Sequence, residues 1–506
     1  MPSHALLRLP SYWAAMEAHP TTLDESASVH QPAATRGLTV TILWHSDLRR
    51  VGRISSTTVV HGTALDLQRT APVFDDGAPL DDPRVSRSPL QVISAADGSA
   101  KLWPGRDGLR YTVDGARGVG GEVLPADRLA RGVVLAFGRR GPLVLLESGL
   151  RQADPVRYGL VGPSEALTRV RGAIDLLAPR SCSVLILGPT GTGKELIARA
   201  LHAHSNRPRL RYVAVNMAAF ANGTAQSQLF GHRKGAFTGA DRNSAGLFGD
   251  HDGGTVFLDE IGASTTDVQA LLLRALESGE VQPVGGRPTT VDVRLIAATD
   301  ELLDDAVQTG RFRRALLHRL AHGTITVPPL ADRPADIATQ LVAFLRGALL
   351  SMGAEERLAP GRDWLPRELV ESVLRMPWSG NSRELRAFAD NLAFQHANDA
   401  RCDVPASAAS VVSPPPEVTP LSELEGALAA CAWRIDAAAR MLGVHRNTLR
   451  RRMAEAGLPR PGQLTSDQIE QARAAADGDP GAAARALRVS VRGLRLRTTQ
   501  LGLPPW

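Results

Sequence analysis

Cysteine and long apolar runs are scarce in this sequence of 506 residues. The three cysteines, Cys182, Cys402 and Cys431, lie far apart and show no Cys-x-x-Cys spacing. That spacing argues against a disulfide framework or a zinc knuckle and predicts three buried thiols. No run of about 18 apolar residues occurs, and the N-terminus, with His4 and Arg8, lacks the apolar core of a signal peptide. We therefore expect a cytoplasmic protein.

Lysine is also rare, since only Lys101, Lys194 and Lys234 occur among 58 lysines and arginines. Lys194 lies in the segment GPTGTGKE, which follows the apolar run SVLIL and opens the helical pattern KELIARAL. Glycines between a strand and a helix let backbone N–H groups point at phosphates, and the ammonium adds a full charge. A structural glycine turn is the alternative. The residues expected to hold ATP are Gly188, Pro189, Thr190, Gly191, Thr192, Gly193, Lys194 and Glu195.

A second apolar strand pattern, GGTVFLDEIG, ends in the acids Asp259 and Glu260. Phosphoryl transfer needs a metal on the phosphates and a positioned water. Asp259 is therefore expected to hold Mg²⁺ through the bound ATP, and Glu260 to polarise the attacking water. The alternative is an acidic pair that merely ends a strand at a turn.

The pattern along the chain indicates several domains, because 506 residues exceed a single core. Residues 1–36 lack periodicity and indicate a flexible leader. Residues 37–150 alternate short β-branched runs with turns, which is typical of an all-β sandwich. From residue 157 to residue 403 strands alternate with helices, as in a parallel sheet flanked by helices. Residues 404–420 contain three consecutive prolines and are expected to be a linker.

The last region, residues 421–506, is basic and helical. It holds 13 arginines against 8 acidic residues, a net charge of +5. Residues 436–459 and 481–504 form an internal repeat, identical at 12 of 24 positions. Each copy fits two helices joined by a tight turn, so we expect two helix-turn-helix units, at 421–462 and 463–506.

The segment GAFTGA, inside LFGHRKGAFTGAD, resembles the signature of sigma-54-dependent transcriptional activators, the bacterial enhancer-binding AAA+ proteins. Further motifs follow in that family's order: YVAVNMAAF, FLDE, VDVRLIAATD, GRFRRALLHRL, TVPPL and PWSGNSREL. The resemblance implies an AAA+ P-loop ATPase, with an α/β subdomain over residues 157–330 and a helical lid over residues 331–403. Gln228 departs from the acid usual at that position.

The resemblance also implies roles around the phosphates. Asn216 matches the switch asparagine, which restrains Glu260 until ATP is sensed. Thr299 and Asp300 match the sensor I position at the end of a strand.

Three arginines match residues that respond to nucleotide or act across a subunit boundary. Arg313 and Arg319 correspond to arginines that reach into a neighbouring subunit's site, and Arg383 corresponds to sensor II of the lid. An arginine acting in trans requires assembly, so the resemblance implies a homo-oligomer, from a dimer to a hexameric ring.

In the family the GAFTGA loop contacts the sigma factor. Glycines permit movement, Phe237 offers an apolar anchor and Thr238 a hydroxyl. An ordinary surface turn, with Phe237 folded back on its own domain, is the alternative. The residues expected to contact sigma-54 are Gly235, Ala236, Phe237, Thr238, Gly239 and Ala240.

The first C-terminal copy resembles the Fis-type helix-turn-helix. Its second helix would enter a major groove, with Arg446 and Asn447 on base edges and Arg450 and Arg452 on phosphates. In the second copy Arg488 replaces the turn glycine, so that copy is a second reader, a dimerisation aid or a remnant. The expected DNA-binding residues are His445, Arg446, Asn447, Arg450, Arg451, Arg452 and Arg492.

The β domain carries VGR and DPRVSRSPLQV, which resemble a forkhead-associated (FHA) domain, a reader of phosphothreonine. Arg53 and Ser86 match phosphate-contacting positions, and Arg87 follows as in that family. Pro89 replaces the usual histidine, and Asp114-Gly115 is a weak match to the later Asn-Gly turn. A β sandwich that contacts a protein without binding phosphate is the alternative.

These features predict a transcription activator that hydrolyses ATP to remodel sigma-54 RNA polymerase and binds enhancer DNA through its C-terminus. The alternatives are another AAA+ remodeller, such as a chelatase or helicase loader, and a DNA-binding regulator with a weakened ATPase.

Overall fold

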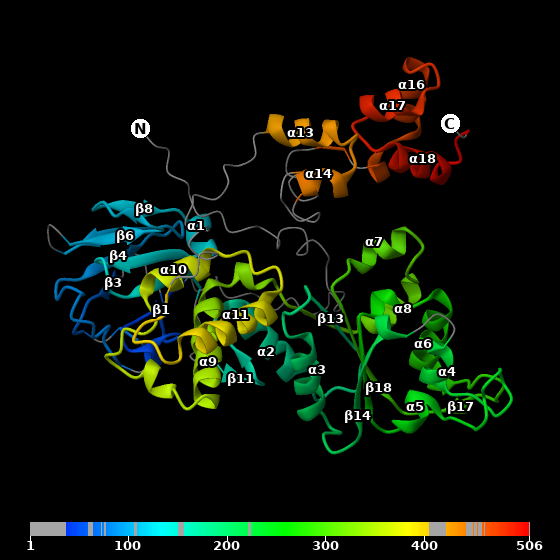
Figure 1. Cartoon of the computed structure of the whole chain (residues 1–506), viewed down its shortest axis with the longest axis horizontal. Coiled ribbons are helices and arrows are strands. Elements are labelled where there is room, and N and C mark those ends of the chain that lie inside the picture. The colour runs from blue at the N-terminus through cyan, green and yellow to red at the C-terminus, as the bar shows by residue number, and fades with distance from the viewer. Residues whose placement is uncertain are drawn as a thin grey trace. The chain divides into compact units, whose positions relative to one another are not determined.

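The computed structural model divides into two units, residues 1–411 and residues 412–506. Their elements are labelled in Figure 1. The expected leader and linker lie outside the described residues. The structure describes residues 37–58, 64–71, 73–74, 77–105, 109–149, 156–220, 224–403, 421–441, 449, 453, 458–459 and 461–504.

The N-terminal domain is mainly β, as expected, with two sheets whose strands pair antiparallel and a short helix, α1 (Ala126–Arg131). One sheet has the order β2-β1-β10-β9-β6-β7, with β1 (Gly37–Trp44), β2 (Ile54–Thr58), β6 (Tyr111–Val113), β7 (Ala116–Arg117), β9 (Val133–Phe137) and β10 (Leu143–Ser148). The other has the order β3-β4-β5-β8, with β3 (Ala64–Leu67), β4 (Leu90–Ser94), β5 (Ala100–Pro104) and β8 (Glu122–Leu124). Alternate residues of both sheets, such as Val40, Ile42, Val92 and Leu102, are buried in one shared core.

The central module has a five-stranded parallel sheet, which confirms the expected α/β fold (Figure 1). Its order is β14-β15-β18-β13-β19, with β13 (Val184–Leu187), β14 (Tyr212–Asn216), β15 (Thr255–Asp259), β18 (Arg294–Thr299) and β19 (Gly323–Thr326). Val256 and Leu258 face one hydrophobic cluster and Phe257 faces another. Strands buried on both faces need continuous apolar runs, and TVFLD is such a run.

Helices cover both faces of that sheet. They are α2 (Glu165–Leu177), α3 (Lys194–Ala203), α4 (Ala225–Phe230), α5 (Gly246–Asp250), α6 (Thr266–Ser278), α7 (Leu303–Gln308) and α8 (Arg314–Leu320). Two short antiparallel pairs complete the module, β11 (Val156–Arg157) with β12 (Leu160–Val161), and β16 (Glu280–Val281) with β17 (Thr289–Thr290).

Three helices form the lid: α9 (Pro334–Ser351), α10 (Arg367–Arg375) and α11 (Asn381–His396). A buried carboxylate joins the first of them to the sheet module. The two oxygens of Asp336 accept hydrogen bonds from the backbone N–H of Ser164 at 2.8 Å and from its hydroxyl at 2.6 Å. Arg333 lies 3.1 Å from the same carboxylate, so the buried acid is both neutralised and hydrogen-bonded.

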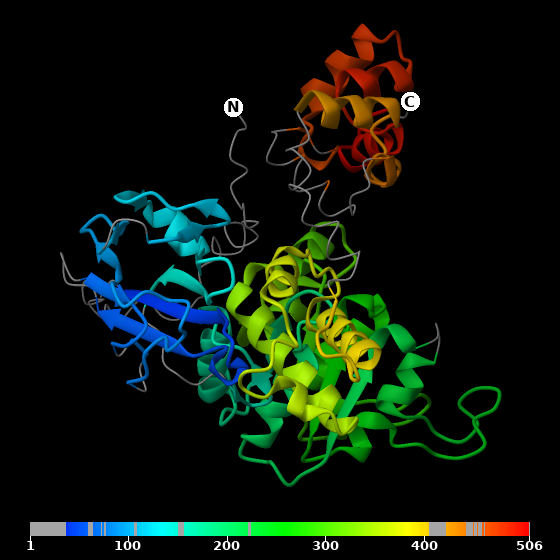
Figure 2. The same ribbon diagram turned by 60° about the vertical axis from the view of Figure 1, so that its left-hand side comes forward.

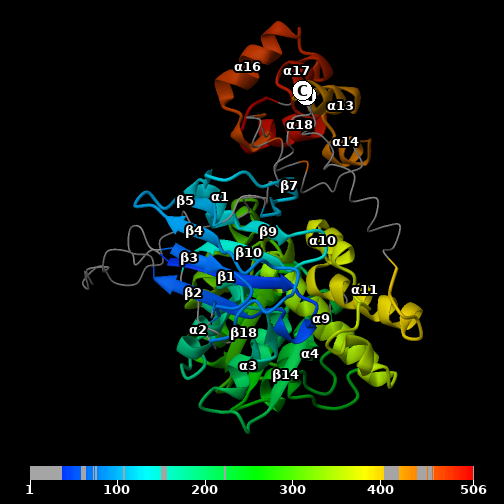
Figure 3. The same ribbon diagram turned by 90° about the vertical axis from the view of Figure 1, so that its left-hand side faces the viewer.

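The lid and the N-terminal β domain share one hydrophobic core. Leu43, Trp44 and Leu145 from β1 and β10 lie in the same buried cluster as lid residues such as Leu341 and Leu369. Figure 3 shows α9 and α10 beside the sheet that contains β1 and β10, and both helices contact β1. The residues 37–150 that the sequence presents as a separate domain therefore complete the interior of the lid.

Hydrogen bonds at the same contact orient the two domains. The indole N–H of Trp44 donates to the carbonyl of Leu365 at 3.0 Å. The guanidinium of Arg367 donates to the carbonyl of Phe137 at the end of β9, at 3.4 Å, and to those of Gly138 and Gly141 in the loop after it, at 3.0 Å and 3.1 Å. Arg367 is only 7% exposed, so these bonds satisfy a charge withdrawn from water.

The C-terminal unit is helical, as expected, with α13 (Leu421–Ala430), α14 (Ile435–Met441), α16 (Ser466–Ala475), α17 (Pro480–Ala486) and α18 (Val491–Gln500). Its two hydrophobic clusters match the internal repeat. Ala438 and Leu449 are buried in one cluster, and their repeat equivalents Ala483 and Leu494 are buried in the other.

One expectation about the cysteines was wrong. Cys402 is buried, and burial raises the pKa of its thiol to about 12, whereas Cys182 and Cys431 are only partly buried. All three are free thiols. No helix among the described residues is long and apolar enough to cross a membrane.

The shared core predicts that Trp44 stabilises the lid as well as the β domain. Trp44→Ala should lower the free energy of unfolding by about 3–5 kcal/mol, because it opens a cavity and leaves the Leu365 carbonyl unpaired. Thermal unfolding of the full chain measures this effect. Trp103→Ala is the control, since Trp103 is 48% exposed. Equal melting temperatures for the two variants would contradict the prediction.

Candidate functional site

The glycine-rich loop lies at the carboxyl end of the parallel sheet, between β13 and α3. Gly191 and Gly193 adopt φ values of +81° and +100°, a conformation that favours glycine. Gly193 is also the residue that caps α3, so the loop leads directly into a helix N-terminus. The carboxyl edge of an open α/β sheet is where such folds bind ligands.

The lysine and threonine of this loop point into it. Lys194 is 6% exposed, and its ammonium donates to the carbonyl of Gly188 at 2.8 Å. The hydroxyl of Thr192 donates to the carbonyl of Pro189 at 2.8 Å. By contrast, Glu195 lies on the outer side of α3 and pairs with Arg199 at 2.8 Å.

The two acids lie at the end of β15, and β18 separates this strand from β13, which leads into the loop. Glu260 adopts the left-handed conformation, with φ +55° and ψ +46°, which is uncommon for a residue with a side chain. The pKa of Glu260 is raised above its ordinary value, first by burial and then by the negative charge of Asp300, while Lys194 opposes the rise. The structure thus brings Glu260, Asp300 and Lys194 into one electrostatic group.

Neighbouring strands bring the switch and sensor positions to the same edge. Asn216 lies opposite Asp259 in the strand register, and its side-chain oxygen accepts a hydrogen bond from the N–H of Ala218 at 2.8 Å. Thr299 is fully buried at the end of β18. Asp300 accepts a hydrogen bond from the hydroxyl of Thr190 at 2.8 Å, which links the sensor strand to the glycine-rich loop.

The lid contacts the glycine-rich loop through a residue that the sequence reasoning missed. The side-chain amide of Asn381 donates to the carbonyl of Thr190 at 2.9 Å and accepts from the N–H of Leu330 at 2.7 Å. Asn381 has φ +54° and is 1% exposed. Asn381 stands two positions before Arg383 in GNSREL. The motif was therefore identified from the sequence, but the bridging role of its asparagine was not.

The lid also packs closely against the loop at Gly191. A Cβ atom added there would lie 2.2 Å from the carbonyl oxygen of Gly380 and 3.3 Å from the Cβ of Arg383. Arg383 itself is exposed on the first turn of α11. The expected sensor II residue therefore lies beside the loop, on the lid.

The two expected trans arginines are both exposed on one side of the module. Arg313 immediately precedes α8, and its Nε donates to the carbonyl of Thr266 at 3.1 Å. Arg319 lies on the last turn of α8, where its Nε is 3.4 Å from the carboxylate of Glu277. An exposed arginine held by its own Nε can present its remaining donors to another molecule.

The GAFTGA segment is an exposed turn beside the β16–β17 hairpin; Figure 2 shows the green loops at this end of the module. Phe237 is 46% exposed, and its ring meets the ring of His232 edge-on at 5.0 Å. Gly235 and Gly239 have φ values of +81° and +94°, and a Cβ at either would meet nothing within 4 Å. Thr238 is exposed and Ala240 is buried at the base.

Of the expected DNA-binding residues, only Arg492 is described. It is exposed on the first turn of α18. Arg488, where the first copy has a turn glycine, itself adopts φ +55° and pairs with Glu425 at 2.7 Å. The turn of the second copy is thus formed without glycine. His445, Arg446, Asn447, Arg450, Arg451 and Arg452 lie outside the described residues.

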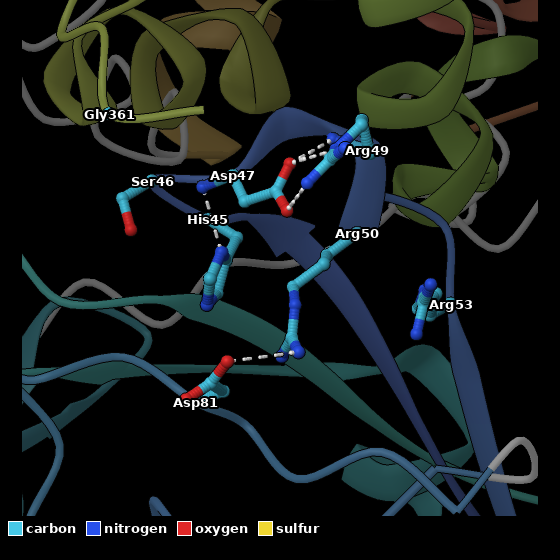
Figure 4. Close-up of a pocket in the computed structure, with 8 residues that line it drawn as sticks. All are labelled: His45, Ser46, Asp47, Arg49, Arg50, Arg53, Asp81 and Gly361. Carbon is cyan, nitrogen blue, oxygen red and sulfur yellow. Dashed lines mark hydrogen bonds and ion pairs between the residues drawn. The ribbon is translucent and has the colours of Figure 1, made fainter. Parts of the chain in front are cut away.

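The β domain has a basic depression of about 490 Å³ at its contact with the lid (Figure 4). Three arginines, Arg49, Arg50 and Arg53, line it, together with His45, Ser46, Asp47, Asp81 and Gly361 of the lid segment. Arg49 pairs with Asp47 at 2.9 Å and Arg50 pairs with Asp81 at 3.4 Å, so the depression that contains Arg53 keeps only a small excess of positive charge.

The other two expected phosphate-binding residues do not line that depression. The hydroxyl of Ser86 accepts a hydrogen bond from the N–H of Ser88 at 2.9 Å, and Arg87 is exposed. Asp114 belongs to the Asp114-Gly115 turn, which was matched weakly to the Asn-Gly turn of FHA domains. Its carboxylate forms an ion pair with Arg128 at 2.8 Å. No cluster of metal-ligating His, Cys, Asp or Glu side chains occurs among the residues the structure describes.

Comparison with known proteins gives two family matches. Residues 160–326 match the sigma-54 interaction domain, and residues 422–455 match the Fis family of bacterial regulatory proteins. The transcriptional regulatory protein ZraR of Klebsiella oxytoca is 39% identical over 318 residues, 60% of this chain and 70% of ZraR. LuxO of Vibrio cholerae is 43% identical over 237 residues, and NtrC of Escherichia coli K12 is 45% identical over 227 residues. The chain spans 44% of LuxO and 47% of NtrC, less than half of either.

The chain belongs to the family of sigma-54-dependent transcriptional activators, in which an AAA+ ATPase module is joined to a Fis-type helix-turn-helix. The resemblance found in the sequence is thereby confirmed for these two parts. The likeness of the β domain to an FHA domain stays a prediction.

The close approach at Gly191 predicts that a methyl group there separates the loop from the lid. Gly191→Ala should weaken ATP binding at least about tenfold, because the added carbon strains φ and collides with the Gly380 carbonyl. Titration with a fluorescent ATP analogue measures the affinity. Gly353→Ala is matched, since Gly353 has φ +69° with nothing within 4 Å. The prediction fails if both variants bind equally.

Proposed function

We propose that this chain assembles into a ring of subunits, hydrolyses ATP between neighbouring subunits, and uses the movement to remodel sigma-54 RNA polymerase. The carrying observation is the combination, within one module, of a glycine-rich loop with Lys194 and an exposed GAFTGA turn with Phe237 at its tip. One part binds nucleotide and the other is available to a partner.

Four groups at the sheet edge fit magnesium-bound ATP. The inward-curled loop and Lys194 suit the phosphate oxygens, and Asp259, at the end of β15, suits the Mg²⁺ shell. Bound Mg²⁺ neutralises phosphate charge while the phosphoryl group is transferred to water. Glu260 would orient that water, and its pKa is raised first by burial and then by the negative charge of Asp300.

Ring assembly is supported by Arg313 and Arg319, which are exposed on the surface of the sheet module. Acting in trans, they would stabilise the charge that develops at a neighbour's phosphates, and Arg383 would do so from the lid. Asn216 would act as the switch for Glu260, and Thr299 with Asp300 would report the nucleotide state. The family implies a homo-oligomer, from a dimer to a hexameric ring.

The C-terminal unit is proposed to hold the protein on enhancer DNA. Arginines at the start of a second helix are suited to the major groove and its phosphates. For the second copy we favour DNA contact, because its two helices and its turn are retained and Arg492 is exposed at the expected position.

The β domain is proposed to sense the activating signal. Its basic depression is suited to an anion such as a phosphothreonine side chain on a partner protein, with Arg53 as the contact that the FHA resemblance implies. A protein contact without phosphate is the second candidate, because Ser86 and Arg87 lie outside the depression.

Transcription from a sigma-54 promoter in vitro tests the proposed activity. Wild-type protein with ATP should activate transcription. Thr238→Ala should abolish activation while leaving steady-state ATP hydrolysis within about twofold. The reason is that Thr238 is exposed on the GAFTGA turn and is not among the residues expected to bind the phosphates. Glu260→Gln should abolish both activities.

Two results would reject the proposal. One is ATP hydrolysis no faster than that of Glu260→Gln, which would favour a DNA-binding regulator with a weakened ATPase. The other is hydrolysis without any binding of sigma-54, even with a transition-state mimic of ATP present, which would favour another AAA+ remodeller.

Deletion of residues 465–506 tests the second helix-turn-helix copy. The first copy has its own hydrophobic cluster and should persist. Operator affinity should fall and its dependence on salt should flatten, since fewer phosphates are neutralised. Arg492→Ala, which keeps the fold, should show a smaller change in the same direction. Unchanged affinity and slope would exclude DNA contact by this copy.

A further inference from the structure

A buried glutamine joins the catalytic turn to the segment that bears the trans arginine. Gln269, on α6, is fully buried. Its side-chain NH₂ donates to the carbonyl of Ser264 at 2.9 Å and to the carbonyl of Arg311 at 3.0 Å. Its carbonyl accepts from the backbone N–H of Arg313 at 2.8 Å. One side chain therefore holds two otherwise separate stretches of backbone.

The first stretch is the turn that carries Glu260. The carbonyl of Glu260 accepts from the N–H of Ala263 at 2.9 Å, and the hydroxyl of Ser264 donates to the carbonyl of Ile261 at 2.7 Å. Gln269 then binds the carbonyl of Ser264. Each of these bonds joins residues close in sequence, so a change in the conformation of Glu260 would shift the Ser264 carbonyl that Gln269 binds.

The second stretch flanks Phe312, which is 3% exposed and packs in the core of the sheet module. The apolar contact already attaches this segment to the module. Gln269 binds the residue on each side of Phe312, so it fixes the direction in which the backbone leaves the core. That direction sets where the Arg313 guanidinium points, because the side chain extends from the residue whose N–H is held.

A purely structural amide is the simpler explanation for a buried glutamine. Gln340 is such a residue, since it donates to the carbonyl of Val161 at 2.9 Å and lies in the lid. The difference lies in what is joined. Gln269 connects the acid that serves a subunit's own ATP with the arginine that serves the neighbour's ATP.

We propose that Gln269 is a positioning residue that couples adjacent ATP sites, by holding the Arg311–Arg313 segment in register with the turn after Glu260. The inference rests on the proposed ring and its trans arginine. Nucleotide in one site thereby influences the arginine offered to the next, through a path inside one subunit.

The test uses the full chain with Gln269→Met, which keeps the side-chain length and removes all three hydrogen bonds. ATP binding should stay near wild type, and ATP turnover should fall at least about tenfold, because an arginine acting in trans contributes more than that to phosphoryl transfer. Gln340→Met is the matched control and should retain turnover. Size-exclusion chromatography with ATP verifies that rings form.

Mixed rings then separate the two sites that Gln269 touches. A subunit with Gln269→Met should keep a working Glu260 and lose its arginine. Mixed equally with Glu260→Gln subunits, whose arginine is intact, it should recover about a quarter of wild-type turnover, the share of interfaces that combine both working parts. Mixed with Arg313→Ala subunits, it should recover nothing.

The mixture of Glu260→Gln with Arg313→Ala is the reference for the ring itself. If that mixture fails to recover turnover, Arg313 does not act in trans and the proposal is rejected together with the ring. If that mixture succeeds, the ring stands and the proposal for Gln269 is tested by itself. Recovery of Gln269→Met turnover by the Arg313→Ala partner, by both partners or by neither would then overturn it. Wild-type turnover of Gln269→Met alone would overturn it as well. Gln269→Leu, which is apolar and also removes all three hydrogen bonds, should repeat the pattern if the methionine variant is unstable.

Discussion

The register of the five parallel strands brings the strand-end residues expected around ATP to one edge of the sheet. Leu187 pairs with Thr299, and Asn216 pairs with Asp259, so the strands end at one level. The N–H of Gly188 extends this ladder by one bond to the carbonyl of Thr299, at 3.2 Å. Side chains far apart in sequence therefore meet without any long connecting loop.

Hydrogen bonds and close contacts then tie the lid to that edge. Asn381 bridges the glycine-rich loop and the segment before α9, and Gly191 has no room for a side chain against Gly380. Asp336 fixes the start of α9 to the cap of α2. The lid is thus connected to the sheet module at two separate places, the glycine-rich loop and the start of α2.

The sequence predicted those parts of the fold that depend on local patterns. A lysine after three glycines, an apolar strand ending in two acids, and alternating β-branched runs each specify their own conformation within a few residues. The repeat predicted two copies of one helical unit, and the structure buries equivalent residues in both copies, Ala438 with Ala483 and Leu449 with Leu494.

What the sequence did not predict depends on contacts between distant segments. The hydrogen bonds of Asn381 to Thr190 and of Gln269 to Arg311 join residues whose neighbours give no sign of the partner. The shared core of Trp44 and the lid is of the same kind. The sequence also suggested that the loss of the turn glycine could degrade the second helix-turn-helix, whereas Arg488 takes the left-handed conformation itself, with Glu425 as a partner.

The shared core has a thermodynamic consequence for signalling. Since Leu43 and Trp44 pack inside the lid, a movement of the lid cannot leave the β domain behind without exposing that apolar surface to water. A molecule bound to the β domain that favours one lid position must change the affinity for nucleotide, and nucleotide must change the affinity for that molecule by the same factor. Binding at the β domain would then alter nucleotide binding, and the bound nucleotide would in turn alter binding at the β domain.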